Sequence, residues 1–343
     1  MKTTNKTHFL LATSAIVSVA AFSASPAFAQ VTELPSTVIT ATTGATGGSD
    51  LTVDNGGNTT LTVDDNTTVG DGTDSAITDV SASGATTFTL NNTGVTGATE
   101  LTVDGDIEQA SGEDFNLEVL EDTGDSAMTL DVDGNLELGN GSVDVTGKEQ
   151  SANLEVAGTT DAGAVTVSTT GAGDASAIFT DNATTGAITV GGAGGGASSV
   201  TASGDLNATG GISLDGSTGA ASLTLDGGAL QGVTGAITTS GTVADTSIIV
   251  NNTSGDNTTF NNIIGVSGQE VGALTVLDGN TTLADDAFVA GDVDVQQDTL
   301  TNNTVATLTA NNITGGGAFA NDGTANVATD VSVTGGVGLG TNG

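Results

Sequence analysis

The chain lacks many of the side chains on which enzymes and small exported domains commonly depend. Its 343 residues include no cysteine, tryptophan or tyrosine, and only two prolines, one histidine and three basic residues. The absence of cysteine excludes disulfide cross-links and thiolate nucleophiles. The scarcity of basic residues excludes nucleic acid as a partner, because almost nothing in the chain could neutralise phosphates.

The segment 1–29 has the three parts of a secretory signal peptide. Lys2 and Lys6 make a basic start, residues 9–24 are an apolar stretch, and Ala27-Phe28-Ala29 is a small-x-small cleavage site. Cleavage after Ala29 leaves Lys148 as the only basic side chain against 41 acidic ones, a formal net charge of −40. No later segment is apolar enough to span a bilayer as a helix. The sequence therefore predicts an exported protein whose mature region does not insert directly in a membrane.

A four-residue unit recurs through the rest of the chain. Leu51-Thr52-Val53-Asp54 is repeated identically at 61–64 and 101–104, and close variants occur at 130–133, 212–215 and 223–226. Alternation sends Leu and Val to one side of a short strand and Thr to the other, and the Asp opens a turn. Such a unit is too small to bury its apolar side alone, so it has to stack on copies of itself.

We predict an all-β fold, a parallel β-solenoid (β-helix) over residues 51–343. It follows the signal peptide (1–29) and a lead-in (30–50) that we expect to be flexible. Two units of about 11 to 12 residues give a coil of roughly 23, although the spacing does not fix the number of strands per coil. Tandem β-sandwiches are the alternative, but they favour longer strands and aromatic core residues. The high charge also suggests disorder, which the regular pattern and a hydrophobic content of 36% argue against.

Calcium is the one cofactor that the sequence suggests, because hard oxygen ligands are abundant. Asp71 and Asp74 belong to a partial match to a glycine-rich calcium repeat. Asp131, Asp133 and Asn135 resemble half of an EF-hand loop, without flanking helices. The alternative interpretation of all five residues is that they are solvated turn residues.

We predict that the protein is not an enzyme. The mature chain has no histidine, cysteine, arginine or tyrosine, so only carboxylates, hydroxyls and Lys148 could act as acids, bases or nucleophiles. Carboxylate pairs such as Asp285-Asp286 leave a polysaccharide-active enzyme as a third hypothesis. Thr-x-Thr units at 87–89, 299–301 and 307–309 leave an ice-binding face as a fourth.

Two segments, 263–283 and 308–316, have a repetitive Gly/Thr/Asn/Asp-rich pattern that extends over most of residues 51–343. With the signal peptide, this region resembles the passenger of Gram-negative autotransporters and haemagglutinin-like surface adhesins. The resemblance implies a β-helical stalk at the outer cell surface, often used for adhesion. That family also carries a C-terminal translocator barrel, which this sequence does not include. We therefore expect either a fragment, or a protein that is secreted or held at the surface in another way.

Two functional hypotheses follow. The first is an exported structural or adhesive protein, extracellular or at the outer cell surface, that contacts host, matrix or neighbouring cells. The second is a self-assembling filament or surface-layer subunit that depends on cations, because the ends of a solenoid are open to stacking.

Overall fold

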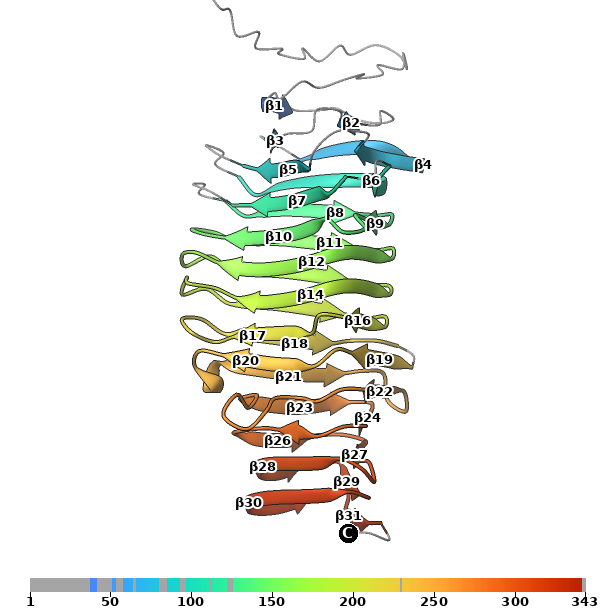
Figure 1. Cartoon of the computed structure of the whole chain (residues 1–343), viewed down its shortest axis with the longest axis vertical. Coiled ribbons are helices and arrows are strands. Elements are labelled where there is room, and N and C mark those ends of the chain that lie inside the picture. The colour runs from blue at the N-terminus through green and yellow to red at the C-terminus, as the bar shows by residue number, and fades with distance from the viewer. Residues whose placement is uncertain are drawn as a thin grey trace, which may run out of the picture.

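The computed structural model describes residues 38–41, 51–53, 58–63, 66–79, 85–92, 97–110, 113–121, 126–228 and 230–340. The signal peptide predicted at 1–29 lies outside these residues, as does most of the lead-in. The described chain is a parallel β-solenoid (Figure 1), which confirms the predicted fold class. Its helical content is a single 3-10 turn, η1 (Val243–Asp245). Within the described residues, no helix is long and apolar enough to cross a membrane.

Each turn of the solenoid runs along three sides, here named faces B, C and A in the order in which the chain meets them. Face B is a ladder of β4 (Thr67–Asp79), β6 (Thr99–Gln109), β8 (Met128–Val132), β11 (Ala152–Val156), β13 (Ala175–Phe179), β15 (Ser198–Ala202), β18 (Ala221–Leu225), β21 (Thr246–Asn251), β23 (Ala273–Asp278), β26 (Asp292–Val295), β28 (Thr307–Gly315) and β30 (Thr324–Val333). Face C contains β2 (Leu51–Val53), β9 (Leu136–Glu137), β16 (Leu206–Ala208), β19 (Gln231–Thr234), β22 (Asn257–Phe260), β24 (Asn280–Leu283), β27 (Thr299–Asn302), β29 (Ala318–Asn321) and β31 (Val337–Leu339). Face A contains β1 (Val38–Ala41), β3 (Asn58–Val63), β5 (Thr86–Asn91), β7 (Phe115–Leu120), β10 (Ser142–Gly147), β12 (Thr160–Thr169), β14 (Ala183–Gly191), β17 (Ile212–Asp215), β20 (Ile237–Ser240) and β25 (Ala287–Phe288).

The central turns have the predicted length. On face B, Ala152 pairs with Ala175, which pairs with Ser198 and then with Ala221, so each turn takes about 23 residues. The predicted coil length is therefore confirmed. The ladder also begins earlier than residue 51, because β1 lies within the predicted lead-in and pairs in parallel with β3.

Turn length changes toward the two ends of the described ladder. Near the N-terminus Thr67 pairs with Leu101, so this turn is longer than the central ones. Near the C-terminus Val293 pairs with Ile313, and Ile313 pairs with Val331, so these turns are shorter than the central ones. The turns of Figure 1 consequently become narrower toward β31.

The repeated unit forms the core as its alternation predicts. In the copy at 101–104, Leu101 and Val103 are fully buried, while Thr102 lies half-buried on the outer side. Leu101 pairs with Leu130 and Leu130 with Leu154, so leucine stacks on leucine through successive turns. Burial of these apolar columns is the main favourable contribution to folding.

Face C is the side that the spacing of apolar residues does not reveal. Its inward positions in β12 and β14 are small or polar: Thr160, Ala162, Ala183 and Thr185 are all buried. Both strands continue round the corner onto face A without interruption, and therefore belong to two faces. In the turns of β12 and β14, only two strong apolar units per coil are visible in the sequence, because the third side is lined there by alanine and threonine. Elsewhere on face C, large side chains such as Leu206 and Phe260 are buried.

Acidic and amide side chains at the corners bind the backbone of the next turn. Asp106 Oδ1 accepts a hydrogen bond from the backbone N–H of Asn135 at 2.6 Å, and Asn135 Oδ1 accepts one from Thr159 at 2.8 Å. Asp205 Oδ1 accepts one from Gly232 at 2.7 Å. Carboxylate acceptors make stronger bonds of this kind than neutral groups do. Part of the high acidity therefore stabilises the corners.

Candidate functional site

The predicted calcium ligands fall in two places in the structure. Asp71 and Asp74 fall within β4, and their side chains lie outside the described part of the chain. Asp131 lies on the outer side of β8, and Asp133 is exposed in the turn that follows. Among the residues that the structure describes, no three or more histidine, cysteine, aspartate or glutamate side chains form a group that could hold a metal ion.

Asn135 has a structural role at its corner. Its side-chain Oδ1 accepts hydrogen bonds from both the backbone N–H and the hydroxyl of Thr159, at 2.8 and 3.0 Å. Two occupied acceptor positions make this oxygen a poor candidate ligand for calcium. The segment that resembles half of an EF-hand loop thus contributes a corner cap.

A group of carboxylates gathers on the outer side of face B near its N-terminal end. The pKa of Asp131 is raised above its ordinary value of 3.8, first by partial burial and then by the negative charges of Asp133, Glu155 and Glu100. Glu155 lies directly opposite Asp131 on the next strand. Like charges in opposed positions destabilise a sheet, so this region should attract cations diffusely.

Asp131→Asn is expected to stabilise the fold at pH 7 by about 0.5 kcal/mol, a small effect because the group is largely solvated. The folded-state pKa is raised, so the unfavourable charge interaction is present above that pKa and is lost as the pH falls through it. The stability that the Asp131→Asn variant gains over the parent chain should therefore disappear near pH 3. Thermal unfolding measured across this pH range tests the prediction.

Asp330→Asn is the matched control, because Asp330 is exposed on β30 and lies opposite Asn312, which carries no charge. Equal gains in the two variants would contradict the proposed charge interaction at Asp131.

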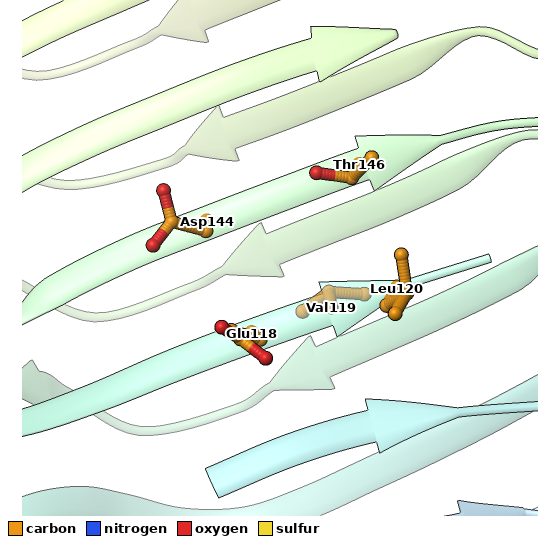
Figure 2. Close-up of a pocket in the computed structure, with 5 residues that line it drawn as sticks. All are labelled: Glu118, Val119, Leu120, Asp144 and Thr146. Carbon is orange, nitrogen blue, oxygen red and sulfur yellow. The ribbon is translucent and has the colours of Figure 1, made fainter. Parts of the chain in front are cut away.

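A shallow pocket lies on face A between β7 and β10. It is lined by Glu118, Val119, Leu120, Asp144 and Thr146 (Figure 2). Glu118 and Asp144 occupy opposed positions on the two strands. Their carboxylates accept hydroxyl hydrogen bonds, Glu118 from Thr89 at 2.6 Å and Asp144 from Ser142 at 3.1 Å. The pocket combines two acids with neighbouring hydroxyls, which suits weak binding of a cation or a polyol.

The other candidates predicted from the sequence, an aspartate pair and the Thr-x-Thr units, lie in different parts of the solenoid. Asp285 accepts a hydrogen bond from the backbone N–H of Asp286, and Asp286 accepts one from Thr307 at 2.7 Å, so this pair caps backbone at a corner. The Thr-x-Thr unit at 87–89 is on face A and the one at 299–301 is on face C. These two units therefore do not form a single array.

Comparison with known proteins gives a simple result. No family model, curated protein or solved structure matches this chain. Its function must therefore be argued from the surface of the solenoid, where outward side chains of similar type stack turn upon turn.

A long uncharged surface of this kind lies on face B, over β13, β15, β18, β21 and β23. We name its outward residues the hydroxyl face. One of its two columns consists of Ser176, Ser199, Ser222, Ser247 and Ala273, which pair in register on successive strands.

The second column of the hydroxyl face is a mixture of threonine and isoleucine. Its members, all half-buried, are Ile178, Thr201, Thr224, Ile249 and Thr275. Sequence reasoning missed this surface. The signal was present as Ser-x-Ile or Ser-x-Thr at 176, 199, 222 and 247, each about one coil after the last.

Proposed function

We propose that the protein is an exported bacterial cell-surface scaffold with a structural or adhesive role and no catalytic activity. The observation that carries this proposal is the stacking of similar outward side chains along the rod, carboxylates toward the N-terminal turns and hydroxyls in the centre. A surface that repeats every turn suits many weak, equivalent contacts with a repetitive partner, which together give avidity.

The site chemistry favours contact over catalysis. The pocket residues Glu118 and Asp144 are acceptors for hydroxyl groups, and the hydroxyl face has no ionisable side chain. We expect a surface of this composition to contact hydrated, polar partners such as glycans of a host, matrix or neighbouring cell. The passenger regions that the sequence resembles are often used for adhesion.

The proposal is tested by export and by adhesion. Expression of the full chain in a Gram-negative host should yield a protein that begins at Gln30 by mass spectrometry and lies outside the cytoplasm. Ala29→Lys should leave an uncleaved precursor in the cell.

Beads coated with the mature chain should then bind intact cells or extracellular matrix above the level of a globular protein of equal charge. Cytoplasmic full-length protein, or beads that bind no more than this control, would refute the proposal.

A second candidate is a filament or surface-layer subunit whose assembly depends on cations. The favouring observation is the last described turn, where Val337 and Leu339 are 49% and 70% exposed. Another solenoid turn stacked there would cover these apolar side chains, and a second copy could supply it. Calcium-dependent filaments seen by electron microscopy would favour this candidate over the first.

A further inference from the structure

We propose that two copies of this chain pair laterally through the hydroxyl face, with the two rods antiparallel. This inference does not depend on export or adhesion, and it differs from the end-to-end stacking considered above. The argument rests on charge, on register and on the order of side chains in the second column.

Charge restricts where two copies can meet. The mature chain has a formal net charge of −40, so most approaches place carboxylate against carboxylate. The two columns of the hydroxyl face have no ionisable side chain on five consecutive strands. Glu155 on β11 and Asp294 on β26 bound the columns along the rod, and Asp226 after β18 and Asp278 at the end of β23 lie beyond them along the strands. Charged strands normally prevent association between sheets. This face is the longest part of the described face B that has no such protection.

Register makes the face complementary to a second copy of itself. β13, β15, β18 and β21 pair over five residues each without a register shift, so their side chains repeat at the strand spacing of about 4.8 Å. A second copy has the same repeat. Small serine and threonine side chains, with isoleucine between them, can then interdigitate as in the dry interfaces between stacked sheets.

The second column is nearly palindromic along the rod. It reads Ile178, Thr201, Thr224, Ile249 over four strands. A two-fold axis along the strands, between β15 and β18, reverses the order of strands in the partner copy. It then places isoleucine against isoleucine at both ends and threonine against threonine in the centre. Isologous contacts of this kind are the commonest in homodimers.

The area of the proposed interface sets the expected strength of association between the two copies. The axis between β15 and β18 overlaps four strands of each hydroxyl face, β13 to β21, and places Thr275 of β23 against Glu155 of the partner copy. Four strands at about 4.8 Å, each about 16 Å long, give roughly 300 Å² per copy. A stable interface buries about 800 Å² per partner, so the pair should dissociate on dilution. The same axis brings Asp131 near Asp294 of the partner copy at both rims, and screening by salt should therefore strengthen the association.

The test is sedimentation of the purified mature chain from about 1 µM to about 1 mM, in low and in high salt. We expect the mean mass to rise from monomer toward dimer with concentration, and further in high salt. Thr201→Asp with Thr224→Asp should weaken association at least tenfold, because each carboxylate faces its counterpart in the partner copy. Thr184→Asp with Thr234→Asp is the matched control, since both threonines are exposed on face C.

Circular dichroism establishes that each variant is folded, and Ser222→Asp replaces the double variant if the latter unfolds. A monomer at every concentration, or equal loss of association in the face C control, would overturn the proposal. Assemblies larger than a dimer that persist in the face B variant would also overturn it and would point to end stacking. Export and adhesion are tested separately.

Discussion

Gly186→Ala is expected to lower the free energy of unfolding by about 3 kcal/mol, because a methyl group has no room at this corner. Gly186 lies at the bend of β14, and a Cβ there would press against the carbonyl oxygen and carbon of Gly163, one turn below. Both contacts are with backbone, so the clash is relieved only by separating two turns of the ladder. Urea unfolding followed by circular dichroism measures the loss.

Gly195→Ala is the control for the same substitution at an open corner. Apart from Gly195 itself and its two chain neighbours, no heavy atom lies within 4 Å of the position that its Cβ would occupy. The expected change is within about 0.5 kcal/mol, because the only effect left is the reduced freedom of the unfolded chain. If both variants unfold at the same urea concentration as the parent chain, the close approach of turns at Gly186 is not a determinant of stability.

Glu121→Ala is expected to lower the free energy of unfolding by about 3 kcal/mol, because it leaves three backbone N–H donors without their charged acceptor. Glu121 is fully buried after β7. Its Oε2 accepts backbone hydrogen bonds from Lys148, Glu149 and Gln150, at 3.1, 2.7 and 3.0 Å. The carboxylate therefore organises the corner that follows β10. Thermal and urea unfolding, with hydrogen exchange at these three amides, measure the effect.

Two controls separate the hydrogen bonds from the charge. Glu121→Gln keeps an acceptor oxygen of the same reach and should lose only about 1 kcal/mol. Glu149→Ala removes the same negative charge from an exposed side chain of the same corner, and should change stability by less than about 0.5 kcal/mol. A loss in Glu149→Ala as large as in Glu121→Ala would show that net charge, and not the cap, is responsible.

The Leu-Thr-Val-Asp unit was sufficient to predict the solenoid and the length of its coil. Alternation in Leu101-Thr102-Val103 determines which side chains are buried, and self-stacking follows because so short a strand cannot bury them alone. Face C could not be predicted in this way. Its inward Thr160 and Thr185 look like surface residues in a sequence, and they are buried only because neighbouring turns enclose them.

The sequence predicted the candidate site less well than it predicted the fold. Asp131 and Asn135 are close in sequence, but strand alternation and the corner give them different surroundings and different roles. Glu121 looks like one more acidic surface residue, since the amides that it binds belong to the next turn of the chain. The hydroxyl face likewise exists only after serines and threonines one turn apart are brought into register.

The shortening of the turns has a consequence for growth along the rod axis. Thr67 pairs with Leu101, and close to the C-terminal end Ile313 pairs with Val331, so the length of a turn falls from 34 to 18 residues between these two places. The first described turn, from Val38 to its partner Thr60, takes 22 residues. If copies stacked head to tail, this first turn would meet the shorter last turns of the next copy, and part of the longer turn would find no strand opposite it. Side-by-side contact makes no such demand, because the central turns all have nearly the same circumference.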